Sequence, residues 1–274
     1  MLSRLSVLSI TATVLATTLF MNADFARAEI IKKPFEYNLA GKKFEGYLAY
    51  DDQAKGSLPG VLVAHNWMGV TDQTTKVVDQ LAQMGYVAFA VDIYGKGVRP
   101  KNTDEAGALA GGFKKDRTSL RGRMQQGLKV LRDQKNVDKN KIAVIGYCFG
   151  GTAAIELARA GADVKAIVSF HGGLDSPKPE DGGKIKGKLL ALHGADDPYV
   201  PATDLVAFED EMRKNKVDWQ LIKYGGAVHS FTEKEAGTDN SKGAAYNEKA
   251  ATRSWLAMRE LFAETIGAGS TVAR

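Results

Sequence analysis

Short, continuously apolar segments alternate with amphipathic ones along most of the chain. Apolar runs of this length are typical of strands buried on both faces, and we expect strands at Gly60–Ala64, Tyr86–Val91, Lys141–Ile145, Val164–Phe170, Leu189–His193 and Trp219–Tyr224. Between them, apolar residues recur at helical spacing, which predicts helices over Thr71–Met84, Leu120–Leu131, Gly151–Arg159, Leu205–Arg213 and Ala244–Phe262. Strands separated by helices pair in parallel through right-handed crossovers, so the pattern predicts an α/β sheet with helices on both faces.

A β-hairpin is expected ahead of this alternating region. Two short segments between Lys33 and Tyr50 flank the turn Ala40-Gly41-Lys42, and the second segment alternates apolar and polar residues. The periodicity alone fits either a barrel or an open, doubly wound sheet, and the hairpin favours the open sheet. Neither a repeat nor a linker divides residues 29–274, so we expect one domain, with Asp175–Gly187 as a surface excursion between two strands.

The first 28 residues have the three-part pattern of a secretory signal. Arg4 precedes an apolar run from Leu5 to Met21, and Ala26-Arg27-Ala28 places small residues at a cleavage site. The alternative is an uncleaved membrane anchor, which needs about 20 predominantly apolar residues, whereas this run is shorter and contains several hydroxyl residues. We therefore expect cleavage after Ala28, a periplasmic or secreted protein, and no stable membrane association after cleavage.

Composition excludes several classes of function. The apolar share of 44% is that of a chain with a packed core, and the net charge of +5 is spread over scattered residues, which argues against nucleic-acid binding. A single cysteine excludes an internal disulfide framework and a thiolate metal cluster. The four histidines lack metal-ligand spacing and no phosphate-binding glycine loop follows the first buried strand, so we expect neither a metal nor a cofactor.

The sharpest motif surrounds the single cysteine. Gly146-Tyr147-Cys148-Phe149-Gly150-Gly151 lies between a predicted strand and a predicted helix. In a nucleophile elbow the reactive residue occupies a tight, strained turn, so the positions two before and two after it must lack bulk. The start of the following helix favours a thiolate, and nearby amides can hold an oxyanion. The pattern predicts a nucleophilic cysteine, and the alternative is a buried structural cysteine beside a helix cap.

An acid and a histidine follow the elbow in the order that such an enzyme requires. Asp196 and Asp197 come directly after the strand that ends at His193, and His229 lies in a glycine-containing loop after the strand that ends at Tyr224. The carboxyl ends of parallel strands meet at one edge of the sheet, so Cys148, Asp197 and His229 are expected together there. Either aspartate also fits a plain turn before proline.

The remaining histidines are weaker candidates. His65 and His171 also follow strands and are candidates for the lining of the pocket, and His193 lies at a strand end beneath it. For all three, a core or supporting role is favoured over catalysis.

These residues resemble the dienelactone hydrolase family of the α/β-hydrolase fold, from about Tyr37 to Leu261. The resemblance rests on the elbow and on three further segments, Val91–Gly97, Asp197–Pro201 and His229–Phe231. It implies a monomeric hydrolase of small esters or lactones with Cys148, Asp197 and His229 as its triad. It also implies backbone oxyanion donors at Phe149 and Trp67 and a substrate pocket formed by His65, Asn66, Lys96, Tyr147, His171, Ser230 and Phe231.

The chain departs from the family pattern at the site. Asn66 stands where the family has a glutamate that assists formation of the thiolate, and an amide cannot take up that proton. Lys96 and Glu233 stand where the family has arginines that hold a substrate carboxylate, and Glu233 would repel such a group. Two other readings remain, a non-catalytic binding protein on the hydrolase scaffold and a peptidase for short peptides.

Overall fold

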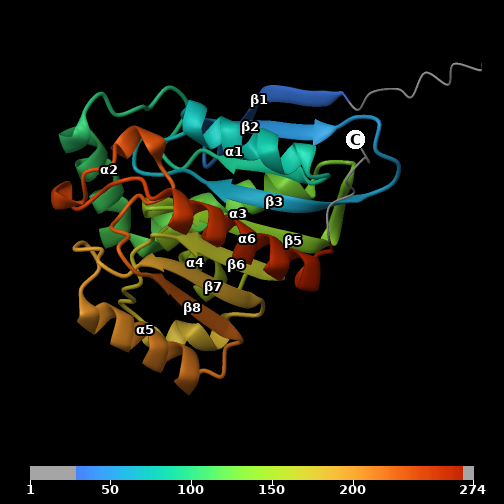
Figure 1. Cartoon of the computed structure of the whole chain (residues 1–274). Helices are drawn as coiled ribbons and strands as arrows, with labels where there is room; N and C mark the ends of the chain where they lie inside the picture. Colours follow the sequence, from blue (N-terminus) through green and yellow to red (C-terminus); the bar gives the residue numbers. More distant parts are fainter. Residues whose placement is uncertain (1–28, 268–274) are drawn as a thin grey trace, which may run out of the picture.

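The computed structural model describes residues 29–267, which are built around an eight-stranded sheet with the strand order β1-β2-β4-β3-β5-β6-β7-β8 (Figure 1). The strands are β1 (Ile30–Leu39), β2 (Lys42–Asp51), β3 (Leu58–Ala64), β4 (Val87–Val91), β5 (Val137–Tyr147), β6 (Ala166–Phe170), β7 (Lys188–Gly194) and β8 (Trp219–Tyr224). The hairpin strand β2 runs antiparallel to both β1 and β4, and the strands from β4 to β8 pair in parallel. The predicted open, mostly parallel sheet with an N-terminal hairpin is confirmed.

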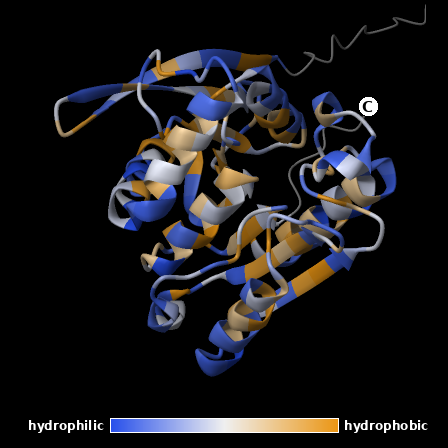
Figure 2. Cartoon of the chain, turned by 90° about the vertical axis from the view of Figure 1, so that its left-hand side faces the viewer, coloured by the Kyte–Doolittle hydropathy of each residue, from blue (hydrophilic) through white to orange (hydrophobic). Residues whose placement is uncertain are grey.

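Helices cover both faces of the sheet, as expected. They are α1 (Asp72–Gln83), α2 (Thr103–Lys115), α3 (Arg117–Arg132), α4 (Phe149–Arg159), α5 (Ala202–Lys214) and α6 (Glu248–Thr265). Helices α1 and α6 enclose one apolar core against the sheet, and α2 to α5 contribute to the other core. Figure 2 shows the hydrophobic colouring concentrated on the strands and on parts of the helices, with many hydrophilic loops. The central strands β4 and β6 are almost entirely apolar because both of their faces are buried.

Two helices differ from their predicted form. The last helix was expected from Ala244 but begins at Glu248, because the side chain of Asn247 caps it by accepting a hydrogen bond from the amide of Ala250. Helix α2 was not predicted, since its glycines interrupt any apolar stripe. Asn102 caps that helix in the same way, so capping rather than periodicity was the available signal.

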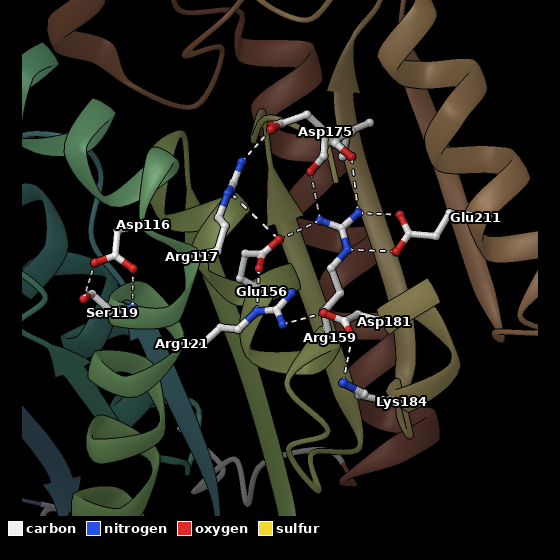
Figure 3. Close-up of polar contacts among 11 residues, drawn as sticks. Asp116, Arg117, Ser119, Arg121, Glu156, Arg159, Asp175, Asp181, Lys184 and Glu211 are labelled. Atoms are coloured by element: carbon white, nitrogen blue, oxygen red, sulfur yellow. Dashed lines mark hydrogen bonds and ion pairs between the residues drawn. The ribbon is translucent and has the colours of Figure 1, made fainter. Parts of the chain in front are cut away.

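The segment expected as a surface excursion is partly buried. Its residues 179–184 form a short 3-10 helix, and Asp181 is buried and accepts a hydrogen bond from Arg121 over 2.6 Å. It belongs to a group that we call the arginine–carboxylate cluster, which lies between α3, α4 and α5 (Figure 3). Its members are Arg117, Arg121, Glu156, Arg159, Asp175, Asp181, Lys184 and Glu211. These ion pairs fix the excursion to the helical layer.

Nothing in the described range tests the predicted export signal, because residues 1–28 lie outside it. Within residues 29–267, the helices are too short or too polar to cross a bilayer.

Candidate active site

The turn between β5 and α4 holds Cys148 in a strained conformation. Its backbone has φ +53° and ψ −119°, a region that side-chain-bearing residues rarely occupy. A Cβ atom at Gly146 would overlap the carbonyl group of Gly150, and one at Gly150 would overlap the carbonyl group of Ala64. The two glycines of the motif are therefore required by close backbone approach, as the nucleophile-elbow interpretation expects.

A chain of hydrogen bonds joins the three residues predicted to act together. The Nε2 atom of His229 lies 3.0 Å from the sulfur of Cys148, and its Nδ1–H donates to Oδ2 of Asp197 over 2.8 Å. The other carboxylate oxygen of Asp197 accepts from the amide of Tyr199 over 2.8 Å, and this side chain is 0% exposed. Both oxygens are thus fixed, and the imidazole is held in one orientation.

Asp196 takes a different place. Its Oδ2 accepts a hydrogen bond from the amide of Gly226 over 3.1 Å, on the exposed side of the two loops. This bond connects the β7 and β8 loops but does not reach His229. The structure brings Asp197, and not Asp196, within hydrogen-bond distance of His229.

The loop that carries His229 is held by backbone contacts on both sides. Its amide donates to the carbonyl of Gly243 over 3.1 Å, and its own carbonyl accepts from the amide of Ala245 over 3.0 Å. The amide of Asn247 in turn donates to the carbonyl of Phe231 over 3.0 Å. We call residues 243–247 the clamp. It explains why the last helix starts later than periodicity predicted, since these residues bind the histidine loop instead of extending the helix.

Electrostatics favour a proton on His229. Burial works against its positive charge, but the hydrogen bonds to Asp197 and Cys148 and their negative charges raise the pKa of His229 to about 10. The imidazole of His229 therefore keeps its proton around neutral pH, and its Nε2 atom faces the sulfur of Cys148.

A second histidine supports the elbow. The amide of Cys148 donates to Nδ1 of His171 over 3.2 Å, so that nitrogen carries no proton, and Nε2–H donates to the hydroxyl of Thr232 over 2.8 Å. Burial and the neighbouring charge of His229 hold the pKa of His171 well below its usual range. His171 is thus a neutral imidazole that ties the elbow to the histidine loop, and its ring packs edge-on against His229.

The loop after β3 is shaped by Asn66. Its Oδ1 accepts from the amide of Met68 over 2.9 Å, and the hydroxyl of Tyr94 donates to the carbonyl of Trp67 over 2.9 Å. Within residues 29–267, the amides of Trp67 and Phe149 donate no hydrogen bond, and Phe149 is the first residue of α4. Two unengaged amides beside a helix N-terminus suit an oxyanion.

The other residues predicted for the pocket fall into two groups. Tyr147, Ser230 and Phe231 are buried around the elbow and the histidine loop, and Tyr147 lines a cavity of about 10 Å³ together with Asn66. His65 is also buried but points away from the triad, since Nδ1 contacts the carbonyl of Asn66 and Nε2 accepts from the amide of Ile93. It supports the loop from beneath.

Lys96 does not join these residues. Its ammonium group pairs with Glu36 of β1 and lies 3.5 Å from Glu45 of β2, so it serves the hairpin. Two carboxylates on the neighbouring strands hold the charge of Lys96, and its place in the substrate pocket stays a prediction.

Two residues near the site were missed by sequence reasoning. Tyr199 packs its ring edge-on against His229, with centroids 5.3 Å apart, yet remains 60% exposed. Gln73 of α1 accepts a hydrogen bond from Asn66 over 2.8 Å. Tyr199 lies in the Asp197–Pro201 segment that carried the resemblance, which was an available signal. Gln73 sits in an ordinary helix and had none.

Residues 29–267 contain no group of three or more histidine, cysteine or carboxylate side chains arranged to hold a metal ion.

Comparison with known proteins identifies the family that shares this arrangement. The model of the dienelactone hydrolase family matches residues 44–266. A protein of Synechocystis sp., provisionally named a carboxymethylenebutenolidase, is 31% identical over 231 residues, which are 79% of this chain and 90% of that protein. A solved dienelactone hydrolase-like promiscuous phosphotriesterase from metagenomic libraries is 38% identical with a TM-score of 0.82, and the match covers 88% of this chain and all of that one.

A more distant solved structure, a protein of Klebsiella pneumoniae provisionally named a dienelactone hydrolase, shares the fold at 21% identity and a TM-score of 0.68. That match covers 86% of this chain and 99% of the other.

Proposed function

Because this chain belongs to the dienelactone hydrolase family and is therefore an ester or lactone hydrolase, we propose that it works through a triad of Cys148, His229 and Asp197 and a thioester intermediate. The observation that carries the proposal is the hydrogen-bonded chain from the sulfur through the imidazole to the carboxylate. A non-catalytic binding protein would not need a strained elbow aligned with a histidine in this way.

In the first half of the reaction the thiolate attacks the carbonyl carbon of the ester. A carbon–sulfur bond forms, and the carbonyl oxygen becomes an oxyanion that the amides of Phe149 and Trp67 stabilise. When the tetrahedral intermediate collapses, the carbon–oxygen bond to the leaving group breaks, and His229 gives its proton to the departing alkoxide. In a lactone the leaving oxygen stays attached to the acyl group, so ring opening has the same proton balance.

In the second half, neutral His229 accepts a proton from water while the water oxygen attacks the thioester carbon. A second oxyanion forms at the same amides, and its collapse breaks the carbon–sulfur bond and releases the carboxylic acid. The sulfur leaves as a thiolate and the proton remains on His229, which restores the starting state. Asp197 holds the imidazole in position and stabilises its positive charge in both halves.

Trapping the intermediate tests this proposal. The full chain is mixed with a slow 4-nitrophenyl ester, quenched in acid and measured by intact-protein mass spectrometry, with Cys148→Ala as the control. We expect the mass of one acyl group on the wild-type protein, located on the peptide that contains Cys148, and none on the variant. Turnover of the ester without any Cys148 adduct, at a level that survives in Cys148→Ala, would contradict the proposal.

Phosphotriesters form a second candidate substrate class. The observation that favours them is the similar relative named a promiscuous phosphotriesterase, which shares 38% identity over its full length. The thiolate would attack phosphorus in place of carbon, and the same amides would receive the developing negative charge. Release of 4-nitrophenol from a dialkyl 4-nitrophenyl phosphate, lost in Cys148→Ala, is the expected result.

The next proposal concerns the cellular location and the oligomeric state of the protein. We propose that residues 1–28 form a secretory signal cleaved after Ala28, and that the mature protein works as a monomer in the periplasm or outside the cell without stable membrane association. The support is the sequence pattern of Leu5–Ala28 and, for the monomer, the family resemblance. N-terminal sequencing of the exported protein and its mass in solution test these two statements.

A further inference from the structure

A half-buried carboxyl group lies between the loop that carries His229 and the loop after β3. Glu233 follows His229 by four residues, and its Oε1 accepts a hydrogen bond from Nδ2 of Asn66 over 3.2 Å. Asn66 belongs to the loop that also carries the amide of Trp67. The contact therefore joins the loop that carries His229, the hydrogen-bond partner of Cys148, to the loop after β3 that carries Trp67.

The charge of Glu233 is weakly compensated. Burial raises the pKa of this carboxyl group, while hydrogen bonds from Asn66, Gln73 and Ser230 and the charge of His229 act in the other direction. In the described range, no lysine or arginine comes within ion-pair distance of it, and His229 is the cation that acts on it. Neutral amide and hydroxyl donors hold a carboxylate without cancelling its field at a distance.

Two cations of the loop after β4 are engaged elsewhere. Lys96 is paired with Glu36 and Glu45 of the hairpin. Arg99 donates to the carbonyl of Val70 and lies 3.7 Å from Asp92. Neither of these two cations holds Glu233.

We infer that Glu233 is a specificity-determining residue that makes the site select uncharged esters and lactones over those bearing a carboxylate. The inference rests on the proposed function and adds the charge class of the substrate. A substrate carboxylate that enters near a partly desolvated carboxylate is repelled. At an effective dielectric constant of about 20, two like charges about 10 Å apart change binding by about tenfold. The hydrogen bond from Asn66, in the loop after β3, fixes the position of the Glu233 carboxylate.

A matched pair of esters tests the inference. The neutral substrate is methyl 4-nitrophenyl succinate, and the anionic one is mono-4-nitrophenyl succinate, which differs by a free carboxylate. For each protein we take the quotient of kcat/KM for the neutral ester over kcat/KM for the anionic ester, after correction for the uncatalysed rates. Any loss of folded protein or of chemical competence affects both esters and cancels in this quotient.

The wild-type quotient is expected to be about ten or more, and Glu233→Gln is expected to lower it about fivefold to tenfold. Glutamine keeps the size of the side chain and an oxygen that accepts from Asn66. The control is Glu235→Gln, which removes the same charge from an exposed position two residues further on and should leave the quotient as in the wild type. If Glu233→Gln does not fold, Glu233→Thr serves as the second uncharged variant.

Three outcomes are distinguishable. A quotient that falls in the Glu233 variant but not in Glu235→Gln supports the inference. A wild-type quotient near one, or an equal quotient in the wild type and the Glu233 variant, overturns it while the proposed function stands. If neither ester acylates Cys148 in the wild-type protein, the proposed function itself fails.

Discussion

Helix α4 has polar groups near both of its ends, and the two ends differ in burial and in how these groups are satisfied. At the first end, Cys148 sits on a strained backbone, and its sulfur has His229 as its hydrogen-bond partner within residues 29–267. Near the other end, Arg159 is 0% exposed and donates to both oxygens of Glu211, to Glu156 and to the carbonyl groups of Asp175 and Leu174.

The difference shows what separates a structural polar cluster from a reactive one. In the arginine–carboxylate cluster, arginines and carboxylates are interleaved, and burial makes the assembly rigid without leaving a group free to react. At the elbow, the sulfur is held by one partner that can take or give a proton. Arg159 is 0% exposed whereas Cys148 is only partly buried, so the elbow combines access for a substrate with a sulfur that has a single hydrogen-bond partner among the described residues.

The largest expected effect comes from removing the reactive atom. Cys148→Ala should lower kcat/KM for a neutral 4-nitrophenyl ester by about 10⁴-fold or more, because the covalent route is lost. Unfolding by urea should change little, since the elbow retains its glycines. Substantial esterase activity in purified Cys148→Ala would mean that another group attacks the substrate.

The next largest effect concerns the other end of α4. Arg159→Met leaves Glu156 and Glu211 buried without their shared cation, and we expect a loss of about 3–5 kcal/mol in the free energy of unfolding. Lys184→Met is the control, because that lysine is 58% exposed and its pair with Asp181 is worth about 0–1 kcal/mol. Urea titrations of both variants measure the two losses. Equal losses would show that the buried cation of the cluster contributes no more to stability than its exposed one.

A smaller effect separates the two neighbouring aspartates. Asp197→Asn should lower kcat about a hundredfold, because the amide no longer favours the required imidazole tautomer or stabilises its charge. Asp196→Asn alters an exposed contact with Gly226 and should retain most of the activity. Steady-state rates of the two variants with one ester make the comparison. Losses of the same size would overturn the assignment of Asp197.

The last prediction concerns the change of stability with pH. The pKa of His229 is raised to about 10 in the folded protein and is about 6.5 in the unfolded chain, so the folded state binds this proton more tightly. The resulting stabilisation is fully present below pH 6.5 and is lost as the pH rises toward 10. We expect the difference in unfolding free energy between the wild type and His229→Gln to shrink from pH 6 to pH 10. A constant difference would contradict the raised pKa.

Local patterns were sufficient for much of the fold. The strand Trp219–Tyr224 has the predicted bounds, and the buried strands were visible as apolar runs because helices cover both of their faces. Helix α2 escaped prediction because glycines break its stripe and its caps stabilise it instead. The clamp was mistaken for the start of α6, since backbone bonds to a distant loop leave no periodic trace.

The site was predictable where it depends on strand ends and short motifs. The elbow, the histidine loop and Asp197 all follow strands of one parallel sheet, so topology brings them together. Asn66 and Glu233 are 167 residues apart in the sequence, and neither lies in a motif from which a contact with the other could be predicted. Lys96 shows the converse, because a position assigned by resemblance is claimed by carboxylates of the hairpin.

The clamp has a consequence for synthesis of the protein. Cys148 and its glycines leave the ribosome well before residues 243–247, yet those residues supply the backbone partners that position the imidazole. A nascent chain without them carries a thiol but has no aligned base. Alignment of the imidazole with the thiol therefore requires synthesis to continue through residue 247, and a chain that stops before residue 243 carries a cysteine without an oriented base.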